Sequence, residues 1–224
     1  MVVGSSLIVA AERVPVQTRE DLVNCTLFAQ LAASGEVGDP TKVGRWYDAY
    51  FRALTALGWA QSATQFEDYS FDSKTAEAHK AVVQVVAALV GPKSAAIAVV
   101  KTAFEALQSM SENTPWITLF DRQSTTARSA RFQVATAQLD EAGLLQIALC
   151  AFSLKATSTL THVLFFKCAS SSISLQYAAG KATIYEAALK ELRESVAARL
   201  ASYRSEYVGL VKFPPPPALS TRRR

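Results

Sequence analysis

The side chains that most often carry out chemistry are scarce in this sequence. It contains two histidines, His79 and His162, and three cysteines, Cys25, Cys150 and Cys168. A hydroxyl or thiol nucleophile needs a base within hydrogen-bonding distance, so a site of that kind would depend on one of the two imidazoles. The HExxH, CxxC, GxSxG, Walker and dinucleotide-binding glycine patterns do not occur. The sequence therefore predicts no metal site and no familiar catalytic motif.

His162 falls in a predicted strand, where strand geometry limits its partners. Cys168 is six residues further along the same predicted strand, so its side chain would lie on the same face as that of His162. Six residues of strand span about 20 Å, which is beyond hydrogen-bonding reach. Cys150 and Ser153 lie on the preceding predicted strand. Ser153 would face His162 if the intervening turn centres on residues 157–158. Because no acid or oxyanion-stabilising group is evident near them, we interpret Ser153 and His162 as a hydrogen-bonded polar pair and assign no catalytic residue.

The three cysteines occur in different surroundings. Cys25 and Cys150 lie in apolar segments, where cysteine commonly acts as a small buried hydrophobe. Cys168 follows Lys167 and precedes three serines, and a neighbouring cation favours the thiolate. Cys168 is therefore the thiol that the sequence itself makes a candidate for acylation or another modification.

Composition limits the class of protein and its partners. Half of the 224 residues are hydrophobic, which is enough for one substantial core. Three of the four excess positive charges come from Arg222–Arg224, so the remainder is nearly neutral and no nucleic-acid partner is predicted. An odd number of cysteines gives no disulfide framework. Since Met1–Ala11 lacks a basic n-region, we expect a protein that is cytoplasmic in the producer or exported without a cleaved signal.

Residues 126–177 carry the signature of a β-sheet, with alternating or continuous apolar residues rich in Val, Ile, Thr and Phe. Turn residues at 140–143 and 156–159 divide this region into an antiparallel meander. An extended segment at 61–71 is predicted to add an edge strand. The three predicted strands of the meander are Thr126–Leu139, Leu144–Lys155 and Leu160–Tyr177, the last broken or bulged near Ala169–Ser172.

Helical periodicity predicts the other elements, and Pro40–Leu57 has the strongest signal. Asp39 is expected to cap this helix and Gly58 to end it. Its aromatic stripe is interpreted as core, not as a ligand site. The remaining predicted helices are Thr18–Ser34, Ser73–Val90, Ser94–Ser109 and Ala182–Tyr207.

The predicted fold class is α+β, with an antiparallel sheet of three to four strands covered by about five helices. Residues 1–213 form a single domain, and residues 214–224 form a disordered proline- and arginine-rich tail.

The predicted helical hairpin Ala76–Leu107 contains two stretches, Ala81–Val90 and Ala95–Val100, that are apolar almost all round. Each of its helices should be only about 24 Å long, against a hydrocarbon core of about 30 Å. The Gly91–Ser94 break would also place a lysine and unpaired backbone groups at the tip. We therefore predict a buried hairpin and no transmembrane segment. Entry into a membrane would require a partner, an acyl group or a large rearrangement.

The order of features also resembles a known family. Trp46-Tyr-Asp-Ala-Tyr50 leads to Gly58-Trp59, and an apolar helical pair, a serine-rich sheet and a terminal helix follow. Over residues 18–207 this layout resembles the Evf-type bacterial virulence factors and similar small toxin-operon accessory proteins. The resemblance implies an α/β architecture and a fatty-acylated cysteine in the core. Cys150 and Cys168 are the positions for it, although neither lies in a matching acylation motif.

The function predicted from these features is binding, without catalysis. The protein is expected to be a virulence-associated or toxin-accessory protein that binds a protein partner, a toxin component, a lipid or a membrane. Apart from a covalent fatty acyl group, no cofactor or metal is expected. Two alternatives stay open: a carrier with a hydrophobic ligand between sheet and helices, and a small hydrolase with an unrecognised site.

The C-terminal tail gives the first testable prediction. Deletion of Pro214–Arg224 should leave the melting temperature, followed by circular dichroism, unchanged. Polyproline and terminal arginines offer nothing that a core would bury. A large drop in melting temperature would show instead that the tail docks on the domain.

Overall fold

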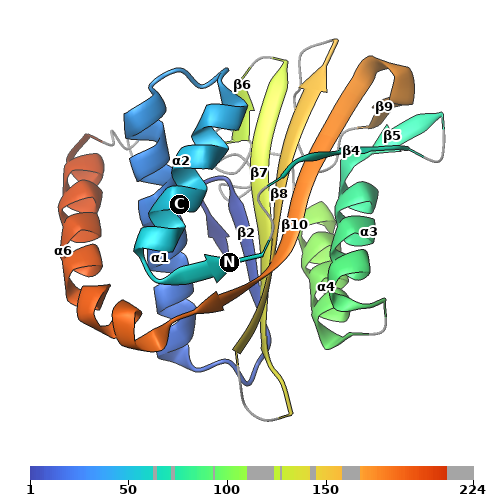
Figure 1. Ribbon diagram of the computed structural model, residues 1–224. Coiled ribbons are helices and arrows are strands. Elements are labelled where there is room, and N and C mark those ends of the chain that lie inside the picture. The colour runs from blue at the N-terminus through green and yellow to red at the C-terminus, as the bar shows by residue number, and fades with distance from the viewer. Residues whose placement is uncertain are drawn as a thin grey trace, which may run out of the picture.

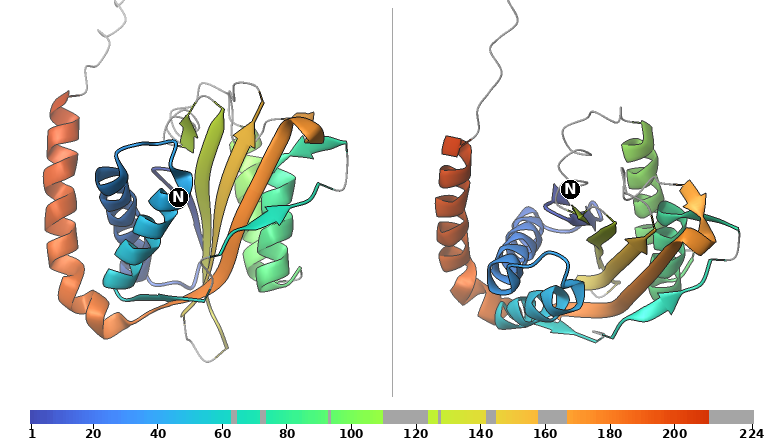
Figure 2. Two further views of the ribbon diagram at one scale, coloured as in Figure 1. Left: turned by 45° about the horizontal axis from the view of Figure 1, so that its top comes forward. Right: turned by 90° about the horizontal axis from the view of Figure 1, so that it is seen from above.

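The protein is a three-layer arrangement in which one β-sheet separates two layers of helices (Figure 1). The computed structural model describes residues 1–62, 65–71, 74–92, 94–109, 124–126, 128–141, 145–157 and 167–210. Seen from above, α1, α2 and α6 cover one face of the sheet, and α3 with α4 covers the other (Figure 2). The helices are α1 (Val16–Val37), α2 (Val43–Ala56), α3 (Ala78–Val90), α4 (Ala95–Ser109) and α6 (Glu186–Leu210).

The main sheet is mixed, and it is larger than predicted. Its eight strands run in the order β1-β2-β7-β8-β10-β3, with β4 also paired to β10 and β6 to β7. The α+β class is confirmed, but the prediction of a purely antiparallel sheet of three to four strands is wrong. The strands of this sheet are β1 (Val2–Val3), β2 (Ser6–Ala10), β3 (Trp59–Gln61), β4 (Glu67–Tyr69), β6 (Thr125–Thr126), β7 (Ser129–Leu139), β8 (Leu145–Ala156) and β10 (Ile173–Ile184).

Part of the enlargement of the sheet comes from pairing between segments that are distant in the sequence. The N-terminal strand β2 pairs parallel to β7, with Leu7 opposite Val134. At the other edge, β10 continues to Ile184 because its end pairs with β3, where Ile184 lies opposite Trp59. The predicted start of the last helix at Ala182 is therefore wrong. The predicted edge strand at 61–71 corresponds to β3 and β4, both paired to β10.

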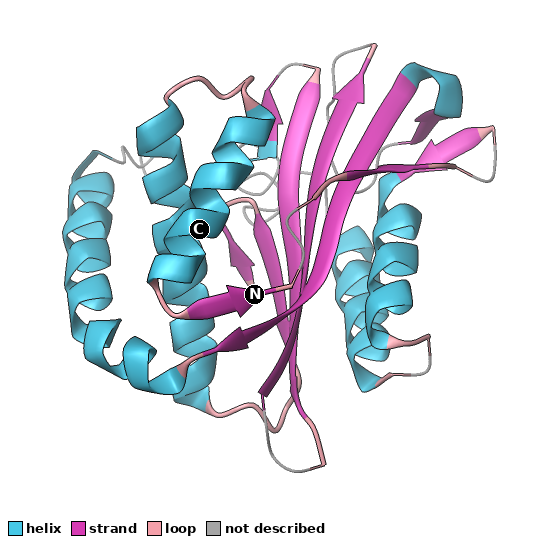
Figure 3. Cartoon of the chain, viewed as in Figure 1, coloured by secondary structure: helices cyan, strands magenta, loops and turns pink. Residues whose placement is uncertain are grey.

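The predicted third strand divides where a break was expected. A short 3₁₀ turn, Ser170–Ser172, separates β9 (Lys167–Ala169) from β10. β9 pairs with β5 (Thr75–Glu77) in a separate two-stranded sheet. This pairing occupies the residues with which the helix predicted from Ser73 would begin, so α3 starts only at Ala78 (Figure 3).

β8 is the centre of the sheet and is buried on both faces. It pairs with β7 on one side and β10 on the other. Because successive side chains point to opposite faces, Leu149 and Ala151 join the core under α1 and α2, whereas Cys150 and Phe152 join the core under α3 and α4. Apolar residues at both parities are what the sequence required of a strand covered on both sides.

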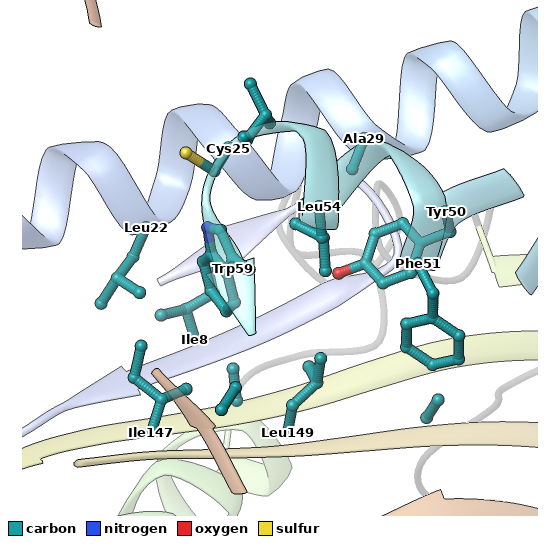
Figure 4. Packing of buried hydrophobic residues seen from close by; sticks show 14 of the residues in the cluster. Ile8, Leu22, Cys25, Ala29, Tyr50, Phe51, Leu54, Trp59, Ile147 and Leu149 are labelled. Carbon is teal, nitrogen blue, oxygen red and sulfur yellow. The ribbon is translucent and has the colours of Figure 1, made fainter. Parts of the chain in front are cut away.

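The aromatic stripe of α2 lies in the first of these cores, as predicted. Trp46, Tyr47 and Tyr50 are each no more than 2% exposed. The Trp46 ring stacks on Tyr50 at 5.2 Å between centroids, and its Nε1 donates to the Ser34 hydroxyl at 3.0 Å. Figure 4 shows Tyr50 and neighbouring side chains filling the space between α1 and the sheet.

The predicted N-terminus of α2 is wrong. Asp39 does not cap the helix; its carboxylate accepts from the backbone N–H and hydroxyl of Thr41, at 2.9 and 2.7 Å. This local turn uses the side chain, so α2 begins only at Val43, after Lys42. Gly58 ends the helix as predicted, with a φ of 85° that other residues rarely adopt.

Buried polar side chains join α1 and α2 to the sheet. The Gln30 amide of α1 accepts from the Ser5 backbone N–H at 2.9 Å and donates to the Val3 carbonyl at 2.9 Å. On β7, the Gln133 amide accepts from the Ser6 hydroxyl at 2.7 Å. It also donates to the Tyr47 hydroxyl of α2 at 3.1 Å.

The Tyr47 hydroxyl completes this network by donating to the backbone carbonyls of Phe152 and Phe132, at 2.7 and 3.0 Å. Gly4 leaves room for the Gln30 amide, since a Cβ at that position would lie 2.3 Å from the Gln30 Oε1. We call these residues the Gln30–Gln133–Tyr47 network.

α6 lies outside α1 and makes a narrow apolar contact with it. Leu189, Val196 and Leu200 are buried, but Tyr185 and Tyr203 are 70% and 44% exposed. The contact is narrow because only one side of α6 faces α1 (Figure 2). The Arg193 guanidinium clamps α6 in place by donating to both carboxylate oxygens of the buried Asp21, at 2.9 and 2.7 Å.

Replacing Trp46 tests the aromatic core. Trp46→Ala should lower the free energy of unfolding by about 3–5 kcal/mol, because the truncation leaves a cavity in a packed interior. Denaturant unfolding measures this loss. Tyr185→Ala is the control, since it removes an exposed aromatic and should change stability little. Equal effects of the two substitutions would contradict the core assignment.

Candidate functional site

The second helical layer, which we call the α3–α4 layer, covers the sheet with apolar side chains. Every buried side chain described on α3 and α4 is apolar. They pack with Phe132, Phe152 and Leu154 of the sheet in a core separate from the one under α1 and α2. The buried members on the helices are Ala78, Ala81, Val82, Val85, Val86, Ala96, Ile97, Val100 and Phe104.

A side-chain hydrogen bond also links this layer to the sheet. The Tyr69 hydroxyl of the edge strand β4 donates to the Gln84 amide oxygen on the exposed side of α3. It lies at the rim of the interface, whereas the Gln30–Gln133–Tyr47 network lies in the buried interior of the opposite layer. Buried hydrogen bonds therefore join α1 and α2 to one face of the sheet, whereas apolar packing and a hydrogen bond at the rim join the α3–α4 layer to the other face.

Cys150 lies under the α3–α4 layer. It is fully buried on β8, opposite Val134 of β7 and Ala179 of β10. Burial raises the pKa of its thiol to about 12, so the nucleophilic thiolate is nearly absent at neutral pH. Cys25, beside Trp59 in the other core (Figure 4), has its pKa raised to about 11, mainly by burial.

Cys168 is brought to the same layer by strand pairing. It lies on β9 opposite Ala76 of β5, and β5 leads directly into α3 at Ala78. The two cysteines singled out from the sequence thus both adjoin the α3–α4 layer, one beneath it and one beside its first helix. Their acylation stays a prediction.

Ser153 belongs to the opposite face of the sheet. It is three residues from Cys150 on β8 and therefore points toward α2. Its cross-strand neighbours are Arg131 on β7 and Gln176 on β10. His162 lies outside the described residues, so the predicted pair of Ser153 and His162 stays a prediction.

Across the residues that the structure describes, no group of three or more His, Cys, Asp or Glu side chains is placed to hold a metal ion. In the same part of the chain, no helix has the length and apolar character needed to cross a membrane.

The sequence analysis missed the polar residues that connect elements. Gln30 and Gln133 are both buried. Their partners lie 24 to 128 residues away in sequence, so local periodicity carried no signal for them. Asp21 is likewise buried and binds Arg193 of α6, 172 residues away.

Comparison with known proteins gives similarity of layout. No protein-family model and no curated protein matches the chain. Among solved structures, it is similar to a delta-endotoxin, with 13% identity, 80% coverage of each chain and a TM-score of 0.47. It is also similar to the activated Cyt2Ba monomer of Bacillus thuringiensis subsp. israelensis, with 13% identity, coverage of 80% of this chain and 97% of that one, and a TM-score of 0.45.

A third similar structure is the Evf virulence factor, with 10% identity, coverage of 92% of this chain and 84% of that chain, and a TM-score of 0.36. The resemblance to Evf-type proteins is confirmed at the level of layout. Identity this low assigns no residue a role.

Thiol reactivity tests the description of the buried cysteines. In a Cys168→Ser variant, neither Cys25 nor Cys150 should react with a thiol reagent at pH 8, because a pKa of about 11 or 12 leaves about one thiolate in a thousand or fewer. Both should react once the protein is unfolded in guanidinium chloride. Fast labelling of the native variant would contradict the burial of these thiols.

Proposed function

We propose that the protein acts by binding and not by catalysis, as a virulence-associated or toxin-accessory protein. Its target is a lipid or membrane surface, which the α3–α4 layer contacts after lifting from the sheet. The observation that carries the proposal is the difference between the two helical layers, one bonded to the sheet through buried polar groups and one packed on it through apolar side chains.

In water the α3–α4 layer stays closed. Its nine buried apolar side chains and the sheet residues beneath them would become hydrated on opening, at a cost on the order of 10 kcal/mol or more. A membrane removes much of this cost, because lipid can cover the same apolar surfaces. Lipid cannot offset the cost of separating α1 and α2 from the sheet in the same way, since the amides of Gln30 and Gln133 would lose their hydrogen-bond partners in lipid.

The connections of the α3–α4 layer also favour its movement. β5, which leads into α3, pairs with β9 and not with the main sheet. α3 and α4 can therefore separate from the sheet without removing any strand from it. The exposed apolar floor would then include Phe132, Phe152 and Leu175.

The lifted layer would lie on the membrane. α3 and α4 have 13 and 15 residues, or about 20 and 22 Å, and a span needs about 30 Å. The fatty-acylated cysteine implied by the sequence resemblance belongs to the same proposal, because Cys150 and Cys168 both adjoin this layer. A hydrophobic-ligand carrier is less favoured, since side chains of the two cores occupy the space on both faces of the sheet.

A matched pair of fluorescent variants tests the proposal. Ala98 on α4 and Ala56 at the end of α2 are both exposed alanines, one in each layer. Each is replaced by cysteine in a Cys168→Ser background and labelled with an environment-sensitive fluorophore. On addition of phosphatidylcholine–phosphatidylglycerol vesicles, the label at Ala98 should shift to the blue and the label at Ala56 should not.

Entrapped dye provides the control for insertion. Because the lifted helices are too short to span, micromolar unmodified protein should leave the vesicles sealed. An unchanged spectrum at Ala98, or an equal shift at both positions, would contradict the proposal. Release of the dye by the protein alone would contradict the surface location of the layer.

A further inference from the structure

A cleft of about 350 Å³ lies where the N-terminus of α2 meets the sheet. It is on the face opposite the α3–α4 layer, because Ser153 and Lys155 of its lining point toward α2, near the end of β8 and the beginning of β10. Its lining comes from the loop before α2, the first turn of α2 and two strands. The lining residues are Thr41, Lys42, Val43, Gly44, Arg45, Ser153, Lys155 and Gln176.

The helix end that enters the cleft has no capping side chain. The residue at the cap position is Lys42, which makes no capping hydrogen bond, and Asp39 is engaged by Thr41. The Val43 amide donates to the Thr41 carbonyl at 3.0 Å, so the partial positive charge of the helix end lies on the amides that follow Val43 in the first turn. A Cβ at Gly44 would meet nothing within 4 Å, so no side chain covers the backbone there.

Ser153 is the second, independent feature of the cleft. It is only 7% exposed and lines the cleft, and its hydroxyl makes no hydrogen bond within the described part of the chain. The Ser153 oxygen is not one of the fully enclosed polar atoms that lack a partner among the described residues, so it is accessible from the cleft. A hydroxyl held in this state can donate to a ligand oxygen.

Cationic side chains line the cleft or lie beside Ser153 in the sheet. Arg45 and Lys155 reach the cleft and form no ion pair among the described residues. Arg131, directly across from Ser153, places its guanidinium 4.3 Å above the Trp46 ring.

The remaining charges near the cleft are partly neutralised. Lys42 lies 3.7 Å from Asp39. Asp68 is at the sheet edge, where its carboxylate accepts from the Gln176 amide at 2.9 Å. The cleft therefore has an excess of positive charge and of hydrogen-bond donors.

We propose that this cleft binds a phosphate group. A helix N-terminus, a buried hydroxyl donor and unpaired Lys and Arg side chains are the groups that bind phosphate oxygens in proteins. The phosphate can belong to a soluble compound or to a lipid headgroup. The site does not depend on movement of the α3–α4 layer, since it lies on the other face of the sheet.

Calorimetric titration with inorganic phosphate at constant ionic strength tests the site. The wild-type protein should bind one phosphate per chain. Ser153→Ala and Lys155→Gln should each weaken binding about tenfold or more, as expected for lost hydrogen bonds to a charged group. Lys190→Gln, which removes an exposed lysine of α6, should bind as the wild type does. Circular dichroism verifies that the variants fold.

Vesicles distinguish the source of the phosphate. If it belongs to a lipid, the protein should sediment with phosphatidylcholine vesicles containing phosphatidic acid, and inorganic phosphate or Lys155→Gln should reduce this binding. Phosphate binding without sedimentation supports a soluble ligand.

Absence of saturable binding of either probe would overturn the proposed site, as would equal binding by the wild type and both cleft variants. The fluorophore at Ala98 reports on the α3–α4 layer separately, so failure of one proposal is distinguishable from failure of the other.

Discussion

The placement of one helical layer depends on the need to pair buried amide groups. Gln30 and Gln133 lie in the interior, where an unpaired amide would cost several kcal/mol. Gln30 lies on α1 and Gln133 on β7, and their partners come from β1, the turn after it, β2 and α2. None of these elements can shift alone without breaking a buried hydrogen bond. Gly4 belongs to the same constraint, because any side chain there would displace the Gln30 amide.

The α3–α4 layer is not subject to this constraint, and that difference gives the two faces different capacities. Apolar contact is nondirectional, so the same side chains can pack equally well on lipid or on a partner. The layer joined by the Gln30–Gln133–Tyr47 network holds its shape and can present a fixed binding geometry. The cleft at the start of α2 belongs to this layer of fixed shape, since α2 is hydrogen-bonded to the sheet through Tyr47.

The sequence was most informative where one element determines the pattern. The spacing of Trp46, Tyr47 and Tyr50 predicted a buried stripe, and the two-sided apolar run around Cys150 predicted a covered central strand; both are confirmed. It failed where distant segments pair. β2 joins β7 across more than 120 residues, and β10 lengthens to meet β3. Local sequence patterns do not reveal either pairing, because the two paired strands are far apart in the chain.

The cleft shows why overall charge is a poor guide to a local site. The chain without its terminal arginines is nearly neutral, so its overall charge gives no argument for a broad basic surface. Yet Arg45 of α2 and Lys155 of β8 line the same cleft as Ser153, and Arg131 lies opposite Ser153 on β7. Ser153 was singled out from the sequence as a partner for His162, on the assumption that its hydroxyl serves a neighbouring strand. In the fold Ser153 lines the cleft at the start of α2, where the cap position carries no capping side chain. Strand parity directs Ser153 toward α2, and this placement makes it the ligand that we propose for phosphate.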